Sequence, residues 1–282
     1  MSEFKFSVII PVYNAEKFVR KAVESALMQE ETGEVILIED KSPDNALDIC
    51  RQLVDEHPDR VRLFRHWFGR NRGAGMSRNL GIKKAKFPYI AFLDADDVFL
   101  ENRFANAKSI FTNDNSIDGV YGNVEVLKDN QIIEVVGIRQ GIKPQDLFAE
   151  MGPIGSSGYF LMSAITIKKT VFKKTGGFGT FKIGEDTFLW MKLAILCKLV
   201  SNEDNRPIAQ YIMHGANITL QSSFMMTELR PKLYFLLSIW GLSKKIKNWQ
   251  MNAIISNGLY HSKINRNKKY SFLFKFLMLL YK

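Results

Sequence analysis

In the first hundred residues, four short apolar runs alternate with segments whose apolar residues recur at helical spacing. The runs cover residues 6–12, 35–38, 61–64 and 89–93. Apolar stretches of strand length separated by crossover helices are typical of a mostly parallel sheet with helices on both faces. We expect Asn14 and Asp44 to cap the first two helices, because Asn and Asp are preferred at helix N-termini.

The pattern changes after Asp97, and the second half of the chain is expected to be mixed. Residues 119–136 predict a hairpin that turns at Lys128, Asp129 and Asn130, and residues 159–167 predict another strand. A glycine-rich turn at 175–184 precedes a predicted helix over 186–197, where apolar residues again recur at helical spacing. Two helices and a final apolar stretch are expected beyond Glu228.

The composition is that of a globular protein, and its charge is unevenly placed. Hydrophobic residues make up 46% of the 282 residues and charged ones 24%, which is enough to bury a full core. The net charge is +10, yet the last acidic residue is Glu228. Residues 229–282 hold eleven Lys or Arg, so the basic excess lies in this one segment.

Cysteine usage and the N-terminus indicate the compartment. Cys50 and Cys197 each stand inside an apolar helical pattern, so we expect two buried core thiols and a reducing environment rather than a disulfide framework. The sequence opens directly into an apolar strand-like run, without the h-region and cleavage site of a signal peptide. These features predict cytoplasmic residence.

Polar residues follow three of the four predicted strands. In open α/β sheets, ligands bind beyond the carboxyl ends of the strands, so these residues are the first candidates for a site. The three groups are Pro11, Val12, Tyr13 and Asn14; Glu39, Asp40, Lys41 and Ser42; and Asp94, Ala95, Asp96 and Asp97.

The third group concentrates negative charge. Asp94, Asp96 and Asp97 repel one another unless a cation or strong hydrogen-bond donors offset their charge. A divalent metal is the simplest explanation, and carboxylate oxygens suit Mg²⁺ or Mn²⁺. The alternative is that Asp96 and Asp97 only cap the helix that follows.

Four segments, in order along the chain, carry a resemblance to a known family. They are residues 7–29 (SVIIPVYNAEKFVRKAVESALMQ), 35–45 (VILIEDKSPDN), 73–97 (GAGMSRNLGIKKAKFPYIAFLDADD) and 176–194 (GGFGTFKIGEDTFLWMKLA). The sequence resembles family 2 glycosyltransferases of the GT-A fold from Phe6 to about residue 219. The resemblance implies a Rossmann-like α/β domain over 1–224 with a mixed, mostly parallel central sheet flanked by helices. Residues 1–98 would be its nucleotide-binding half and 99–224 its acceptor-binding half, followed by a basic helical extension over 225–282.

The resemblance also assigns roles on the donor side. Pro11 and Tyr13 would line the pocket for the nucleotide base, and Asp40 would accept a hydrogen bond from that base, commonly uracil. Arg78 would lie beside the base or the phosphates. Asp94 and Asp96 match the family's Asp-x-Asp, with Asp94 near the ribose and Asp96 on a Mg²⁺ or Mn²⁺ ion that holds the pyrophosphate. Asp97 extends this acidic group without an assigned role.

On the acceptor side, Asp186 matches the family's general base, and Glu185 is its neighbour. The alternative for both is that acidic residues complement the dipole of a helix N-terminus. His214 would reach the metal or the pyrophosphate, or else be structural. Its segment lacks the arginine that many family members carry shortly before the histidine.

The chemistry of sugar transfer fits these roles. Cleaving a sugar from a nucleoside diphosphate leaves negative charge on the phosphate, which a metal neutralises. Attack from the opposite face needs a carboxylate that takes the proton of the acceptor hydroxyl, and one such base gives inversion.

The Gln-x-x-Arg-Trp segment of processive synthases is absent, which favours addition of a single sugar. The glycine-rich loop 152–158 would either close over a substrate or only connect two elements.

The segment 263–282 joins a basic cluster to about ten residues dominated by Phe, Leu and Met. We expect it to lie against an anionic membrane at the cytoplasmic face, where the acceptor would be a lipid-linked or surface glycan in polysaccharide synthesis. The alternatives are a core helix or a homodimer contact, and no nucleic-acid-binding module accompanies the charges.

Rival functions of the whole protein are a nucleotide-sugar-binding scaffold without turnover, and a nucleotidyltransferase. The intact acidic set argues against the first, and the sequence after the first strand lacks the phosphate loop of the second.

Overall fold

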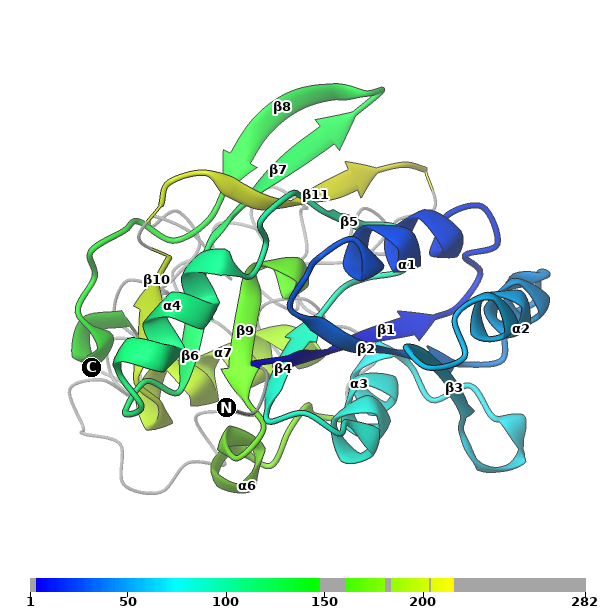
Figure 1. The fold of residues 1–282 in the computed structure, drawn as a ribbon, viewed down its shortest axis with the longest axis horizontal. Coiled ribbons are helices and arrows are strands. Elements are labelled where there is room, and N and C mark those ends of the chain that lie inside the picture. Colours follow the sequence, from blue (N-terminus) through cyan, green and yellow to red (C-terminus); the bar gives the residue numbers. More distant parts are fainter. Residues whose placement is uncertain (1–3, 148–160, 181–183, 203, 216–282) are drawn as a thin grey trace, which may run out of the picture.

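A computed structural model describes residues 4–147, 161–180, 184–202 and 204–215. Its first half alternates strands and helices along the chain (Figure 1). The elements are β1 (Phe6–Val12), α1 (Val19–Leu27), β2 (Thr32–Glu39), α2 (Ala46–Glu56), β3 (Val61–Arg65), the 3-10 turn η1 (Trp67–Gly69), α3 (Ala74–Lys84) and β4 (Tyr89–Phe92). All four predicted strands are confirmed to within a few residues.

Seven strands form the main sheet in the order β10-β6-β9-β4-β1-β2-β3. Strands β4, β1, β2 and β3 are mutually parallel, whereas β9 (Ile165–Lys168) is antiparallel to both β4 and β6 (Gly119–Tyr121). Strand β10 (Leu199–Ser201) pairs parallel with β6. The mixed, mostly parallel sheet that the sequence predicted is therefore confirmed.

A second sheet of four strands has the order β5-β11-β7-β8. Its members are β5 (Val98–Phe99), β11 (Pro207–Met213), β7 (Asn123–Lys128) and β8 (Gln131–Val136). The hairpin β7–β8 turns at Asp129 and Asn130, which both have positive φ, as a two-residue hairpin turn requires. The predicted turn is thus confirmed, but β6 is a separate strand of the main sheet rather than part of this hairpin.

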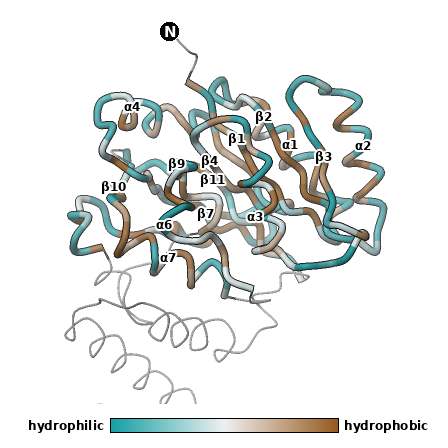
Figure 2. Tube along the Cα trace, turned by 90° about the horizontal axis from the view of Figure 1, so that it is seen from below, coloured by the Kyte–Doolittle hydropathy of each residue, from teal (hydrophilic) through white to brown (hydrophobic). Residues whose placement is uncertain are grey.

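The main sheet buries both of its faces. Ile9, Ile36 and Phe92 belong to one core together with residues of α7 (Glu185–Leu196), whereas their neighbours Val8 and Ile10 belong to a second core with α1 and α2. This alternation follows from the period of two along a strand. Figure 2 shows hydrophilic and hydrophobic segments alternating along α2, as expected for a helix with one buried face. Short helices α4 (Ala105–Asn113) and α6 (Val171–Thr175) and the turns η2 (Pro144–Asp146) and η3 (Met162–Ala164) complete the described fold.

The two predicted helix caps, Asn14 and Asp44, differ from the structure. Asn14 is not an N-cap, because α1 begins only at Val19 and Asn14 adopts a left-handed conformation with φ of 53°. Asp44 does accept a hydrogen bond from Ala46 N at 3.2 Å, although the residue at the cap position is Asn45. Its second oxygen accepts from Glu16 N at 2.8 Å and ties the loop after β1 to the loop after β2.

The other predicted elements have mixed outcomes. The helix expected over 186–197 is α7, shifted by one residue. The strand expected over 159–167 begins only at Ile165, because residues 162–164 form η3. The loop 152–158 and everything expected beyond residue 215 lie outside the described residues. Within the described part of the chain, no helix is long and apolar enough to cross a membrane.

Candidate active site

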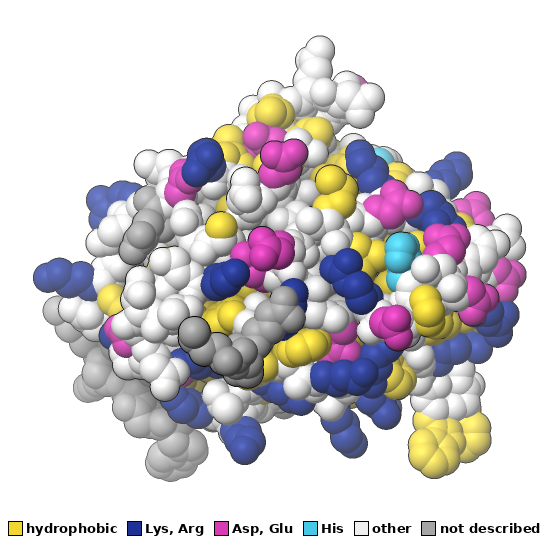
Figure 3. Space-filling model, in the orientation of Figure 1, with side chains coloured by type: hydrophobic (Ala, Val, Ile, Leu, Met, Phe, Trp, Pro, Cys, Tyr) yellow, Lys and Arg dark blue, Asp and Glu magenta, His cyan; other side chains and the backbone are white. Residues whose placement is uncertain are grey.

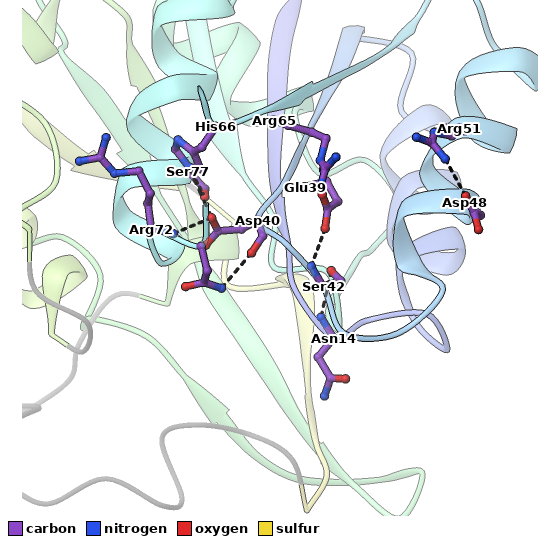
Figure 4. A network of polar contacts seen from close by, with 11 residues as sticks. Asn14, Glu39, Asp40, Ser42, Asp48, Arg51, Arg65, His66, Arg72 and Ser77 are labelled. Carbon is purple, nitrogen blue, oxygen red and sulfur yellow. Dashed lines mark hydrogen bonds and ion pairs between the residues drawn. The ribbon is translucent and has the colours of Figure 1, made fainter. Parts of the chain in front are cut away.

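Asp40 follows β2 and is held by backbone amides (Figure 4). Its carboxylate oxygens accept hydrogen bonds from Arg72 N and Gly73 N, each at 2.7 Å. The side chain of Asn71 donates to the Asp40 carbonyl at 2.8 Å. Burial raises the pKa of Asp40, and the two backbone N–H donors oppose that shift. Since Gly73 immediately precedes α3, Asp40 fixes the start of that helix.

The surroundings of Asp40 are polar and well connected. His66 Nε2 lies 3.0 Å from Ser77 Oγ and 3.7 Å from Asp40 Oδ1. The adjacent Glu39 accepts from Ser42 N at 2.5 Å and from Arg65 Nε at 2.6 Å. Both contacts hold the loop that leaves β2 in place.

Pro11 and Tyr13 lie at the matching end of β1. Pro11 is paired in register with Ile38 of β2, and Asp40 N donates to Val12 O at 2.9 Å. Tyr13 is half exposed. The ends of β1 and β2 therefore place Pro11, Tyr13 and Asp40 in one neighbourhood, as expected from parallel strands.

Arg78 on α3 joins two acidic residues that are far apart in the sequence. Its guanidinium donates to Asp94 Oδ1 at 2.5 Å and to Glu185 Oε1 at 2.9 Å. Burial alone would lower the Arg78 pKa, but the charges of Asp94 and Glu185 outweigh it and raise the pKa. The sequence did not predict this bridge, in which one buried cation balances carboxylates from the end of β4 and the start of α7.

The start of α7 carries Glu185 and Asp186, after Gly184 with φ of 82°. Burial and the charge of Asp186 raise the pKa of Glu185 to about 7, against the opposing charge of Arg78. Asp186 is half-buried, and its Oδ1 accepts from Thr187 N at 2.6 Å. Asp186 also raises the pKa of Arg78, so it belongs to the same electrostatic cluster.

The glycine-rich turn before α7 packs against the start of α3. Asn79 holds Phe178 through two hydrogen bonds, to its N at 2.9 Å and its O at 3.1 Å. A Cβ at Gly75 would lie 2.7 Å from Glu185 Cγ, so only glycine allows the two helix starts to approach this closely. These contacts hold the start of α7, which carries Glu185 and Asp186, against α3.

Asp96 is paired with His214, which follows β11. The Nε2 atom of His214 lies 3.0 Å from Asp96 Oδ2, and its ring stacks on Phe18 with centroids 4.7 Å apart. Burial and the charge of Asp94 raise the pKa of Asp96, whereas His214 opposes the shift. Asp97 is fully buried, accepts from Ile212 N at 3.2 Å, and has its pKa raised well above the usual range by burial.

The structure gathers the residues that the sequence selected. Asp40 fixes the start of α3, Arg78 of α3 holds Asp94 and Glu185, and Asp96 stands two residues beyond Asp94. Three further residues of the site, Phe18, Asn71 and Asn79, were not among the residues that the sequence selected. Phe18 stands in an apolar pattern at helical spacing, and the two asparagines carry no separate signal because their partners are backbone atoms. Among the described residues, no three His, Cys, Asp or Glu side chains group with the geometry of a metal site.

The comparison with known families confirms the resemblance. Residues 7–146 match the family described as Glycosyl transferase family 2. An uncharacterized glycosyltransferase of Nostoc sp. is 28% identical over 233 residues, which cover 81% of this chain and 70% of the relative. An Escherichia coli protein, the UDP-Glc:alpha-D-GlcNAc-diphosphoundecaprenol beta-1,3-glucosyltransferase WfgD, is 33% identical over 134 residues, or 47% of this chain and 51% of that protein.

Solved structures share the fold. Residues 1–349 of S. aureus TarS in complex with UDP-GlcNAc superpose with a TM-score of 0.67 and 17% identity, covering 95% of this chain and 75% of that one. The mannosyltransferase PcManGT from Pyrobaculum calidifontis, in complex with GDP-Man and Mn²⁺, gives a TM-score of 0.56 at 16% identity, covering 97% and 85%. At these identities the likeness establishes the fold alone. With this fold and the family match, the chain belongs to the family 2 glycosyltransferases of GT-A fold.

Proposed function

We propose that this glycosyltransferase is an inverting, metal-dependent enzyme that transfers one sugar from a nucleoside diphosphate, most simply a UDP-sugar, to a hydroxyl group. The observation that carries the proposal is the bridge from Asp94 through Arg78 to Glu185. It connects the end of β4 to the start of α7, and thus connects the proposed donor end of the site to its proposed base.

On the donor side, Pro11 and Tyr13 line the base pocket and Asp40 accepts a hydrogen bond from the base. Each carboxylate oxygen of Asp40 has more than one acceptor position, so the bonds from Arg72 N and Gly73 N leave capacity for a ligand. The uracil assignment draws support from WfgD, whose name contains UDP-Glc, and from the TarS structure, which is a complex with UDP-GlcNAc.

The residues around Asp96 fit a divalent cation. Asp96 and His214 offer one carboxylate oxygen and one imidazole nitrogen, and both side chains are partly exposed. Two protein ligands suffice where a cation such as Mg²⁺ or Mn²⁺ takes its other oxygens from waters and from the substrate pyrophosphate. When bound, the metal supplies Lewis-acid stabilisation of the leaving diphosphate. Asp94 stays close to the ribose, held in place by Arg78.

Asp186 is the general base that takes the proton of the acceptor hydroxyl. Glu185 is unsuited to this role because it is buried against Arg78, whereas Asp186 is its more exposed neighbour. A single carboxylate base opposite the leaving group gives inversion at the anomeric carbon.

The acceptor is proposed to be a glycan or a lipid-linked sugar in cell-surface polysaccharide synthesis. The name of WfgD describes transfer to a sugar on diphosphoundecaprenol, which supports an acceptor of this class. The segment 263–282 would bring the enzyme to the cytoplasmic face of an anionic membrane, with a homodimer contact as its alternative role. The rival function is a scaffold that binds the donor without turnover.

A donor screen tests this proposal. Thermal unfolding is followed with UDP-, GDP- and dTDP-sugars, each with Mn²⁺ or with EDTA, because ligand binding to the folded state raises the Tm. We expect one UDP-sugar to raise the Tm with Mn²⁺ and to do so much less with EDTA. A rise with every nucleotide sugar regardless of metal would contradict the assigned donor site. Binding without release of UDP in the presence of lipid-linked acceptors would favour the scaffold.

A further inference from the structure

The loop between β3 and α3 presents two large aromatic side chains to solvent. Trp67 and Phe68 are each 82% exposed, and their ring centroids lie 5.8 Å apart. In Figure 3 a hydrophobic projection stands out from the lower right of the molecule, where Figure 1 places this loop. None of the proposed donor or acceptor contacts uses these two rings, and leaving both in water is unfavourable.

The tip of the loop has a conformation that apolar residues rarely adopt. Phe68 has φ of 59° and ψ of 20°, and Gly69 follows with φ of 54°. A left-handed conformation is unfavourable for a bulky side chain, and such strain persists only where the surrounding structure maintains it. The turn is closed by a hydrogen bond from Gly69 N to His66 O at 2.9 Å, and both rings lie exposed on it.

The base of the loop is firmly attached to the nucleotide end of the sheet. Asp40 accepts the N–H groups of Arg72 and Gly73, and Asn71 donates to the Asp40 carbonyl. On the other side, Arg65 is paired with Glu39 at 2.6 Å. The aromatic tip therefore projects from a loop whose two ends are held by hydrogen bonds and an ion pair.

The charged residues that follow the tip in the sequence are basic. Between Arg60 and Leu93 the sequence has no Asp or Glu but nine basic residues: Arg60, Arg62, Arg65, Arg70, Arg72, Arg78, Lys83, Lys84 and Lys86. Arg62, Arg65 and Arg78 are paired with carboxylates from elsewhere in the chain, so Arg70 and Arg72 carry the positive charge next to the tip. Arg70 and Arg72, which follow the tip in the sequence, are both exposed, and the Arg70 guanidinium lies 5.9 Å from the Phe68 ring centroid. Figure 3 shows further Lys and Arg side chains along the adjoining lower edge.

We propose that Trp67 and Phe68 insert into the interface of an anionic phospholipid bilayer while Arg70 and Arg72 contact its headgroups. Tryptophan favours the membrane–water interface, and basic residues near an anionic surface add attraction that falls off within a Debye length. A second protein molecule is a less suitable occupant, because a convex tip with positive flanks would meet an identical positive tip. The proposed contact is made by residues other than 263–282 and does not depend on which sugar is transferred.

A site-specific probe tests where the membrane lies. Phe68→Cys, in the full chain, is labelled with an environment-sensitive fluorophore. Burial raises the thiol pKa of Cys50 and Cys197 to about 12, so neither native cysteine competes near neutral pH. Ile133→Cys on β8, whose parent side chain is 53% exposed, is the matched control. Vesicles containing phosphatidylglycerol should shift the emission at position 68 to the blue but not at position 133, and pure phosphatidylcholine should shift it far less.

Vesicle co-sedimentation measures the strength of the contact. The double variant Trp67→Ser and Phe68→Ser should lower partitioning by roughly tenfold or more, as expected for removing two inserted aromatic side chains. Arg70→Gln should lower it by about fivefold. Ile133→Ser with Val135→Ser, and Lys21→Gln on α1, are the matched controls and should leave it unchanged.

Two outcomes would overturn the proposal. Unchanged emission at position 68 while the protein sediments with vesicles would mean that another segment makes the contact. A blue shift that requires no lipid and grows with protein concentration would mean that a second copy covers the tip. No sugar donor is present in these assays, so neither outcome bears on the proposed transfer reaction.

Discussion

Asp40 and the pair Asp94–Glu185 lie at the same end of one sheet, yet their charges are balanced differently. Asp40 is held by the backbone N–H groups of Arg72 and Gly73, which belong to the loop it anchors. Asp94 and Glu185 share a single side-chain cation, Arg78. Backbone donors fix a carboxylate without adding charge, whereas a shared arginine makes two carboxylates depend on one residue.

The difference separates two tasks within the proposed site. The Asp40 end is built as a rigid surface against which a flat base can rest. The Arg78 end is a cluster of coupled charges, in which Asp186 raises the pKa of Glu185 and Arg78 lowers it. We therefore expect substitutions at the first end to change donor affinity and substitutions at the second to change turnover or stability.

The largest effect is expected from Asp186→Asn. Removing the general base should lower kcat by about 10²- to 10⁴-fold and leave the donor KM within a few-fold of the wild type, because the base acts on the acceptor. Steady-state kinetics with the donor found in the screen measures both constants. Glu134→Gln, an exposed acid on β8, is the control and should behave as wild type. Wild-type kcat in Asp186→Asn would exclude Asp186 as the base.

Arg78→Met should be the most destabilising change in this cluster. It leaves Asp94 and Glu185 without their cation, and we expect the free energy of unfolding to fall by about 3 kcal/mol, at the low end for breaking a buried pair because Asp94 keeps some contact with water. Urea unfolding measures the loss. Arg51→Met, which removes an exposed pair with Asp48, should cost about 0–1 kcal/mol. Equal losses of unfolding free energy in the two variants would show that Arg78 does not balance the charges of Asp94 and Glu185.

Asp40→Asn tests the other end of the site with a smaller expected effect. The Asn amide group would turn an N–H donor toward Arg72 N or Gly73 N, so one charge-assisted hydrogen bond is lost. Because Asp40 is also the proposed acceptor for the nucleotide base, we expect the donor KM to rise by about tenfold, the effect of losing one such hydrogen bond. The kcat should change little. Asp48→Asn on α2 serves as the control. A fall in kcat with an unchanged KM would reverse the division of tasks.

Much of the fold could be predicted because strand and helix periods are local. The apolar runs at 6–12 and 61–64 match β1 and β3, and the helix predicted over 186–197 is α7 within one residue. The wrong predictions lie where tertiary contacts, and not local residue preferences, determine the structure. Asn14 matches the residue preference of an N-cap, but the chain needs a left-handed turn at that position before α1 can begin. Strand β6 has only three residues and joins a sheet whose other strands are distant in the sequence.

The candidate residues can be selected from the sequence, but the contacts between them cannot. Carboxylates after β2 and β4 stand out in the sequence because strand ends converge at one edge. Nothing in the sequence shows that Arg78 chooses Asp94 and Glu185, since that choice depends on how α3 packs against the turn at Gly177 and Phe178. The pairing of Asp96 with His214 is equally hidden in the sequence, because Asp96 follows a strand of the main sheet and His214 follows a strand of the second sheet. The stacking of Phe18 on the imidazole ring is hidden for the same reason.

The most direct test of the account is the affinity of UDP, measured by calorimetry with Mn²⁺ and with EDTA, for wild type, Asp96→Ala and the control Asp48→Ala. We expect tight binding by wild type and Asp48→Ala only when Mn²⁺ is present. Asp96→Ala should bind UDP weakly and equally under both conditions, because the proposed cation contact to the diphosphate has been removed. Equal, Mn²⁺-dependent affinity in all three proteins would contradict a metal-held diphosphate at Asp96.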